Sequence, residues 1–322
     1  MPPIFFSTTV VPLGHPSKFK PDNLAVLQLL SEGEIEIMKS EAYKADTVDE
    51  SKFFGHHKLS IGKPADAAQS LEDLMQVQAV RSEYYNRISR EVEGIQEEVD
   101  QFISDSTDPA VQQAVEDAKD LLDYICSKKR EPTKKDYPNG TVDGGTLKSL
   151  QDFQTTPQAV RAKLSVAELV ALRFYTTTAY QFMNNPLRDG KPCLLPVTTY
   201  FAYNGIKKLR KMHVGTDGTS LGKAELWRGL RNRELSDGFT QRGGTELAFM
   251  STTRDLRVAV HYCLIKEHAP RSLFFKVVAP DFMSMGADVQ WLSTFPGEAE
   301  IVYPPLTYLK PTGREQVPAG WM

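Results

Sequence analysis

The spacing of apolar residues changes part-way along this chain, and that change limits the folds the chain can adopt. Between residues 70 and 126, apolar side chains recur every three or four positions, which is the period of an amphipathic helix. From Glu225 onward they stand in short runs such as ELWRGL and SLFFKVVAP, bounded by Gly, Pro and Asp, which are typical of strands. The pattern predicts an α+β chain, with helices first and most strands in the C-terminal half.

The helical part predicts an α-hairpin. A first amphipathic helix of about eight turns runs from residue 70 to Phe102. The segment from Asp105 to Pro109 interrupts it, and a second helix follows as far as Ile125. Asp108 and Pro109 are typical of an N-cap and a first helical position.

A linker is predicted after the hairpin. Residues 127–146 are rich in charge, Pro and Gly, with almost nothing to bury. Their basic cluster leaves two interpretations open, a solvated linker and a partner-docking signal. A chain of 322 residues is long enough for two domains. We therefore expect a mainly helical N-terminal region over residues 1–145 and a second domain over residues 146–322.

Two weaker patterns precede the hairpin. Residues 23–41 predict a helix, with leucines on its apolar face. His56 and His57 lie in a segment rich in Gly, Ser and Lys. Adjacent histidines alone do not build a metal site, so this segment is interpreted as a solvated loop.

The second domain begins with helical patterns. Apolar residues predict a helix over Val166–Met183, which should end at Asn184–Asn185–Pro186 because proline disfavours helix before it. A shorter helical piece follows around Tyr200–Leu209, and the Gly-rich residues 215–222 are turn-like.

Composition excludes several classes of protein. The net charge of −3 and the pI of about 6.1 show no electrostatic footprint for nucleic acid. No run of 18 apolar residues, basic amphipathic face or signal peptide is found, so we expect a cytoplasmic protein that does not bind membranes. The three cysteines are far apart and predict neither disulfides nor a zinc site. The oligomeric state stays open.

Common catalytic motifs are absent from the sequence. The segment GTDGTSLGK is not a phosphate loop, because only three residues separate Gly218 from Gly222 and Ala224 follows Lys223. The sequence contains no G-x-G-x-x-G after a strand, no H-E-x-x-H and no G-x-S-x-G. Typical kinases, dehydrogenases, zinc proteases and esterases are therefore excluded.

Three short segments carry the chemistry that is left. Arg228 and Gly229 lie in a predicted strand, where a guanidinium needs an anion if it is buried and otherwise points to solvent from a strand edge. Ser251, Thr252 and Thr253 end another strand before a helix. Their hydroxyls suit either a helix cap or a bound ribose or carboxylate.

The third segment contains two glutamates. Glu298 and Glu300 follow a Pro-Gly turn, and residues two apart on a strand share a face. Two neighbouring carboxylates repel each other, and such pairs occur where catalysis must stabilise a developing positive charge. The alternative is a solvated strand edge.

Taken in order, these segments resemble the mono-ADP-ribosyltransferases of the Arg-Ser-Glu type, which include arginine-specific vertebrate enzymes and cholera-toxin-like proteins. The helix LRFYTTTAYQFMNNPLR also resembles the leading helix of that family, with its Tyr-Thr and its Asn-x-x-Leu-Arg ending. The resemblance covers about residues 165–310. It implies a split, mainly antiparallel β-sandwich that binds NAD⁺ as a substrate and needs no metal. The α-helical N-terminal domain that precedes it here is expected from the apolar pattern and not from the resemblance.

The resemblance also implies roles for individual residues. Arg228 would hold the NAD⁺ pyrophosphate, and Gly229 would face the nicotinamide amide. Ser251, with Thr252 and Thr253, would orient the catalytic Glu300. Glu298 would bind an acceptor arginine, and two aromatic residues of the same loop would contact the substrate. These aromatic residues are Trp291 and Phe295.

The reaction implied is transfer of ADP-ribose from NAD⁺ to a protein arginine with release of nicotinamide. Two alternatives stay open, an NAD⁺ glycohydrolase and a non-catalytic NAD⁺-binding module. The vertebrate enzymes are secreted or anchored and carry disulfides, whereas this chain shows neither feature, so a cytosolic enzyme or a delivered effector is expected. A further hypothesis is that the N-terminal helices restrain the active site.

Overall fold

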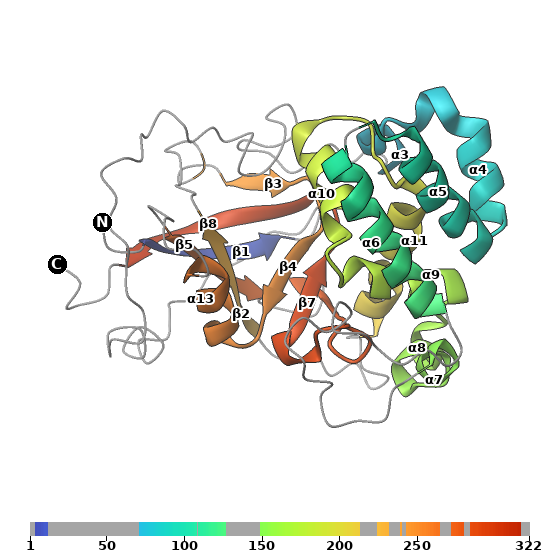
Figure 1. Ribbon diagram of the computed structural model, residues 1–322. Coiled ribbons are helices and arrows are strands. Elements are labelled where there is room, and N and C mark those ends of the chain that lie inside the picture. Colours follow the sequence, from blue (N-terminus) through green and yellow to red (C-terminus); the bar gives the residue numbers. More distant parts are fainter. Residues whose placement is uncertain are drawn as a thin grey trace. The chain divides into compact units, whose positions relative to one another are not determined.

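The computed structural model describes residues 4–11, 71–107, 109–126, 149–212, 224–231, 239, 243–264, 272–279 and 284–316. The expected helix at residues 23–41, the two adjacent histidines, the linker at 127–146 and the Gly-rich turn at 215–222 lie outside these ranges. Helices and antiparallel strands both occur, which confirms the α+β class (Figure 1).

The chain divides into two compact units, each assembled from distant segments. Unit 1 combines Met1–Ala68, His213–Met285 and Pro305–Met322, and unit 2 combines Gln69–Met212 with Gly286–Pro304. The hairpin helices after residue 70 and the helices after residue 149 thus share a unit. This grouping differs from a division of the chain at residue 146.

Unit 1 is built on strands. Its elements are β1 (Ile4–Val11), β2 (Ala224–Arg231), β3 (Gly244–Glu246), β4 (Met250–Thr253), α13 (Leu256–Leu264), β5 (Ser272–Ala279) and β8 (Thr307–Gln316). The strands lie in the order β3-β8-β1-β5-β2-β4. The predicted runs around ELWRGL and SLFFKVVAP are confirmed as β2 and β5, and the run ELAFMST divides between β3 and β4.

One strand of unit 1 comes from a region that the sequence predicts to be mainly helical. β1 lies between β5 and β8, parallel to the first and antiparallel to the second (Figure 1). The other strand pairs of unit 1, β2–β4, β2–β5 and β3–β8, are antiparallel. The mainly antiparallel character is therefore confirmed, whereas the split of the sheet into a sandwich stays a prediction.

Unit 2 is mainly helical. Its helices are α3 (Leu71–Met75), η3 (Val77–Val80), α4 (Arg81–Ser89), α5 (Val92–Asp105), α6 (Pro109–Cys126), α7 (Leu150–Gln154), α8 (Pro157–Ala162), α9 (Val166–Tyr175), α10 (Tyr180–Asp189) and α11 (Pro196–Lys211). Two short strands, β6 (Ala287–Asp288) and β7 (Glu300–Tyr303), pair antiparallel, and the turn η5 (Pro296–Glu298) precedes β7.

α9 is the central helix of unit 2. Every residue from Ala167 to Tyr175 is buried, as expected for a helix surrounded by others, and α5, α6, α7, α10 and α11 all pack on it. Ser165 and Glu168 form a capping box at its start, and Glu168 also binds Lys208 of α11 at 2.7 Å. α9 thus ties the early and late helices of the unit together.

The long helix predicted over residues 70–102 is wrong as a single element, because it divides into α3, η3, α4 and α5. Two non-glycine residues with left-handed φ make the main breaks, Gln76 (57°) and Glu91 (52°). α4 and α5 pack so closely that a Cβ on Gly94 would lie 2.0 Å from the carbonyl oxygen of Arg87. Periodicity cannot detect such breaks when successive helices keep the same apolar face in phase. The second helix, with Pro109 at its start, is confirmed as α6.

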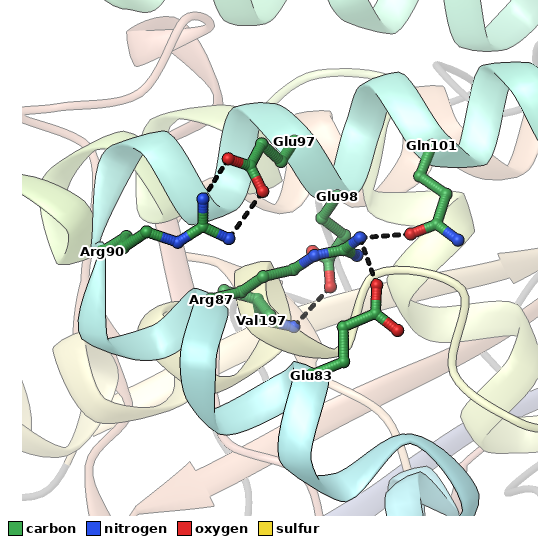
Figure 2. Close-up of polar contacts among 7 residues, drawn as sticks. All are labelled: Glu83, Arg87, Arg90, Glu97, Glu98, Gln101 and Val197. Atoms are coloured by element: carbon green, nitrogen blue, oxygen red, sulfur yellow. Dashed lines mark hydrogen bonds and ion pairs between the residues drawn. The ribbon is translucent and has the colours of Figure 1, made fainter.

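A buried carboxylate anchors α5 to α11. Glu98 is 3% exposed, and its carboxylate accepts a hydrogen bond from Val197 N at 2.7 Å (Figure 2). It also accepts hydrogen bonds from Thr198 N (2.9 Å) and Thr198 Oγ1 (2.8 Å). These donors belong to the first turn of α11, where backbone N–H groups have no partner within the helix. Leu195, the local N-cap residue, makes no side-chain cap. Glu98 therefore caps α11 from a distant part of the sequence.

Charged pairs lie beside Glu98 on α4 and α5. Arg87 binds Glu83 at 2.5 Å and also Gln101, and Arg90 binds Glu97 through two hydrogen bonds (Figure 2). Exposed pairs of this kind contribute little to stability. These pairs lie within the hairpin, whereas the cap by Glu98 links the hairpin to α11.

The predicted helix over residues 166–183 also divides. α9 ends at Tyr175, and α10 begins at Tyr180 after a short turn. α10 then continues through Pro186 to Asp189, so the predicted end at Asn184–Asn185–Pro186 is wrong. Gly190, with φ of 60°, ends the helix instead, and this left-handed conformation suits glycine. The helical piece predicted at residues 200–209 is confirmed within the longer α11.

Candidate functional site

Arg228 lies on β2 with its side chain largely buried. Its Nη1 donates to the carbonyl oxygen of Ser251 on β4 at 2.8 Å, and its Nη2 lies 3.6 Å from Oε2 of Glu246. The side chain is 13% exposed, so the alternative of a solvent-facing arginine at a strand edge is wrong. A guanidinium held by a carbonyl and a carboxylate is fixed in position.

Glu246 was not among the residues selected from the sequence. It ends β3, is 2% exposed, and its Oε1 accepts a hydrogen bond from Ala248 N at 3.1 Å. A buried charge requires a partner, and Arg228 supplies one. In the sequence Glu246 is a single acidic residue at the start of the run ELAFMST. Only its burial and its distance from Arg228 identify it.

The segment Ser251–Thr253 forms most of β4. Ser251 is half-buried and Thr252 is buried. Thr253 pairs with Trp227 of β2, and its Oγ1 accepts a hydrogen bond from Asp255 N at 3.0 Å, just before α13. The cap of α13 (Leu256–Leu264) comes from Asp255, whose Oδ1 accepts a hydrogen bond from Arg257 N at 2.9 Å, so the helix-capping interpretation is wrong for Thr253. Ser251 also binds Arg228 through its carbonyl oxygen, which links β4 to β2. Gly229 is half-buried on β2 and pairs with Phe274 of β5.

The two glutamates of the Glu-x-Glu segment have different backbone conformations. Glu300 is the first residue of β7 and is 9% exposed, whereas Glu298 ends η5 and is half-buried. Ala299 between them has a φ of 47°. The prediction that both glutamates lie on one strand face is therefore wrong. A left-handed alanine costs roughly 1–2 kcal/mol, and strained residues of this kind cluster at functional sites.

Trp291 and Phe295 lie between β6 and η5 and are both half-buried. Trp291 donates from Nε1 to the carbonyl oxygen of Asp288 at 3.1 Å. Phe295 N donates to Ser293 Oγ at 2.9 Å, and Phe295 O accepts from Glu298 N at 3.0 Å. The two aromatic residues thus belong to the turn that leads into the Glu-x-Glu segment.

The predicted site residues divide between the two units. Arg228, Gly229 and the Ser251–Thr253 segment belong to unit 1, and Trp291, Phe295, Glu298 and Glu300 belong to unit 2. Within unit 1 the structure brings Arg228 and Ser251 together. Within unit 2 it places both glutamates and both aromatic residues on the single stretch from 291 to 300.

Neither a metal centre nor a reactive cysteine finds support in the described ranges. These ranges hold no cluster of three or more His, Cys, Asp or Glu side chains that could bind a metal ion. Burial raises the pKa of the Cys126 thiol to about 11 and that of Cys193 to about 12, so both are protonated at neutral pH. A separate finding is that none of the helices described is both long and apolar enough to cross a membrane.

Comparison with known proteins gives three similar structures. No protein-family model and no curated protein matches the chain. A mutant of the eukaryotic mono-ADP-ribosyltransferase ART2.2 in complex with NADH is 14% identical, covering 68% of this chain and 77% of that chain, with a TM-score of 0.38. A second crystal form of ART2.2 is 15% identical over the same shares, with a TM-score of 0.39.

The third structure is the type III effector XopAI from Xanthomonas axonopodis pv. citri, lacking 70 N-terminal residues. It is 14% identical and covers 70% of this chain and 88% of that chain, with a TM-score of 0.33. Similarities of this size do not establish a shared family or activity.

Proposed function

We propose that this protein transfers ADP-ribose from NAD⁺ to an arginine side chain of a target protein. The observation that carries the proposal is the order of three segments along the chain, Arg-Gly on β2, Ser-Thr-Thr on β4 and Glu-x-Glu at the start of β7. Each segment lies on or directly before a strand, as the resemblance to Arg-Ser-Glu transferases requires. Two features of the structure add support, the burial of the Arg228 side chain and the burial of Glu300.

Glu300 is the residue to which we assign the main chemical role. Loss of nicotinamide from NAD⁺ leaves a ribose with oxocarbenium character, which a nearby carboxylate stabilises. A buried carboxylate is more effective than an exposed one, because less water screens its charge. A pre-positioned group of this kind contributes roughly 3–4 kcal/mol to lowering a barrier.

Arg228 would bind the pyrophosphate of NAD⁺. A guanidinium presents five N–H donors in a fixed plane, and phosphate accepts two of them side by side. Glu246 and the carbonyl oxygen of Ser251 hold this guanidinium in position within unit 1. In this proposal Gly229 and Thr252 line the same NAD⁺ site, and Ser251 orients the catalytic glutamate.

Glu298 would hold the acceptor. An arginine side chain is always charged and is a poor nucleophile, so transfer requires a carboxylate that binds the guanidinium and accepts a proton. Glu298 is half-buried at the end of η5, where Gly297 beside it leaves open space. Trp291 and Phe295 would contact the acceptor from the same stretch.

The proposal is tested by incubating the full-length protein with labelled NAD⁺ and agmatine, a small guanidine acceptor. Wild type should form ADP-ribosyl-agmatine, Glu300→Gln should form none, and Glu298→Gln should release nicotinamide without the adduct. Glu97→Gln, an exposed glutamate of α5, is the matched control and should behave as wild type.

Two other results would redirect the assignment. Nicotinamide release by wild type without any adduct would indicate an NAD⁺ glycohydrolase. Binding of NAD⁺ without turnover would overturn the proposal in favour of a non-catalytic NAD⁺-binding module.

A further inference from the structure

The loop of residues 289–295, here called the Trp291 loop, connects β6 to η5 within unit 2. Its backbone makes a tight turn, in which the N–H groups of Leu292 and Ser293 both donate to Val289 O, at 3.1 and 2.9 Å. The N–H of Val289 donates to Glu300 O at 3.1 Å. The start of the loop is thus bound directly to the first residue of β7.

The end of α9 holds the far side of this loop through a pair of threonines. Thr294 N donates to Thr176 Oγ1 at 3.0 Å, and Thr294 Oγ1 donates to Thr176 O at 2.9 Å. The Thr176 hydroxyl itself donates to the carbonyl oxygen of Arg173 at 2.7 Å. Both threonines are buried, so water does not compete effectively for these bonds.

A buried arginine holds the middle of the loop. Arg173 is 4% exposed, and its Nη1 donates to Leu292 O at 2.7 Å. Its guanidinium lies 4.1 Å from the centroid of the Phe153 ring on α7, within the range of a cation–π interaction. The Phe153 ring in turn lies 6.4 Å from the ring of Trp291. Arg173 and Phe153 therefore contact both the backbone of the loop and its aromatic side chain.

These contacts give a role to a motif that the proposed function leaves unused. The motif is Tyr175–Thr176 within the sequence YTTTAYQFMNN. The hydroxyl oxygen of Tyr175 accepts a hydrogen bond from Asn184 Nδ2 of α10 at 3.5 Å. This contact links the end of α9 to α10. The same helix end presents Thr176 to the loop. Burial of a cation such as Arg173 is costly unless it has partners, and Leu292 O and the Phe153 ring supply them.

We propose that Thr176, Arg173 and Phe153 are positioning residues that fix the Trp291 loop and thereby determine how the acceptor is bound. This inference rests on the proposed function, because the acceptor site at Trp291, Phe295 and Glu298 belongs to that proposal. The positioning residues do not touch the acceptor. They act through the backbone at Leu292 and Thr294 and through the ring of Trp291.

The decisive comparison is between Thr176→Val and Thr176→Ser in the full-length protein. Valine keeps the shape of threonine but loses the hydroxyl, whereas serine keeps the hydroxyl. The control is Thr178→Val, because Thr178 lies two residues further along and is exposed. Hydrogen–deuterium exchange of the Thr294 amide should be about tenfold faster in Thr176→Val only, since that amide loses its acceptor.

The second readout separates acceptor binding from NAD⁺ cleavage. In Thr176→Val, KM for agmatine should rise roughly five- to tenfold, while nicotinamide release without acceptor stays within about twofold of wild type. Thr176→Ser should restore KM. If Thr176→Val does not fold, Phe153→Leu tests the same loop from α7 and should also raise KM.

The outcomes distinguish this inference from the proposed function. An active wild type whose KM for agmatine is unchanged in Thr176→Val overturns the positioning role alone. An equal rise in KM for Thr178→Val also overturns it, because the effect would then not depend on the loop contacts. A wild type that does not consume NAD⁺ overturns the proposed function, and this inference falls with it.

Discussion

Glu98 and Glu300 are both buried glutamates of unit 2, 3% and 9% exposed, but they occupy different kinds of position. Glu98 lies within α5, and its carboxylate accepts three hydrogen bonds from the first turn of α11. Glu300 begins β7 directly after Ala299, a residue with left-handed φ. The helix cap explains why Glu98 is buried. Glu300 stands instead at a strained turn within a recognisable motif, so burial alone does not distinguish a structural carboxylate from one to which we assign a catalytic role.

The largest expected effect separates the two residues by activity. Glu300→Gln should lower NAD⁺ turnover about 10²–10³-fold, because an amide cannot stabilise a developing positive charge as a carboxylate does. Glu98→Gln should stay within roughly threefold of wild type, since the amide oxygen can still accept from Thr198 N and Thr198 Oγ1 at α11. Nicotinamide release under saturating NAD⁺ measures both. Equal loss of activity in the two variants would show that the comparison is mistaken.

The next largest effect is on stability, and it belongs to Glu98 rather than to Glu300. Glu98→Ala removes the acceptor for Val197 N, Thr198 N and Thr198 Oγ1, all of which are buried. Loss of a cap costs about 1 kcal/mol, and further unsatisfied donors raise the cost to about 3 kcal/mol. The melting temperature should therefore fall by roughly 5–10 °C.

Glu97→Ala is the matched control for this measurement, because Glu97 is the neighbouring residue and is exposed. Its partner is Arg90, on the surface of the hairpin (Figure 2). A fall in melting temperature equal to that of Glu98→Ala would mean that the cap on α11 contributes nothing specific.

The cap on α11 also affects how the hypothesis that the N-terminal helices restrain the active site can be tested. Deleting residues 1–145 would remove Glu98 and with it the cap on α11, so point substitutions test that hypothesis more cleanly than truncation.

The two glutamates also show how far the sequence allowed prediction. Glu300 could be selected because Arg228, Ser251 and Glu298 precede it in the order that the Arg-Ser-Glu resemblance predicts. Glu98 could not, because an acidic residue in an amphipathic helix is ordinarily solvated, and its partner lies about a hundred positions away along the chain. Glu246 escaped selection because its partner Arg228 lies on a different strand, so no local pattern joins the two residues. Residues whose importance arises only from a long-range contact leave no local pattern.

Local backbone events limited the prediction of the fold in the same way. Periodicity located the helices of unit 2, but not the left-handed residues Gln76 and Glu91 that divide the first of them. Pro186 was expected to end a helix, whereas the helix ends at Gly190. The strands β2 and β5 were predicted from their composition, and β1 was missed because it pairs with segments more than 250 residues away.

The smallest expected effect is a dependence of stability on pH that belongs to Glu98. Burial raises the pKa of this carboxyl from its ordinary value of 4.5 to about 7, and hydrogen bonds from Thr198 and Val197 and the charge of Arg87 offset only part of that rise. A carboxyl with a raised pKa keeps its proton in the folded protein at pH values where the unfolded chain has lost it. Its contribution to stability is therefore complete below about pH 4.5 and is lost as the pH rises through about 7.

The free energy of unfolding of wild type should accordingly fall by about 2 kcal/mol, relative to Glu98→Gln, between roughly pH 5 and pH 8. This is less than the whole rise in pKa would give, because part of the change falls below pH 5. Denaturant unfolding of both proteins across this range measures the difference, and other titrating groups cancel because they are common to both. Parallel profiles would mean that Glu98 has an ordinary pKa in the folded protein. If the free energy of unfolding of wild type instead increased with pH relative to that of Glu98→Gln, the charged carboxylate would be the better cap. Attraction from the N–H groups in the first turn of α11 would then exceed the cost of burying the charge.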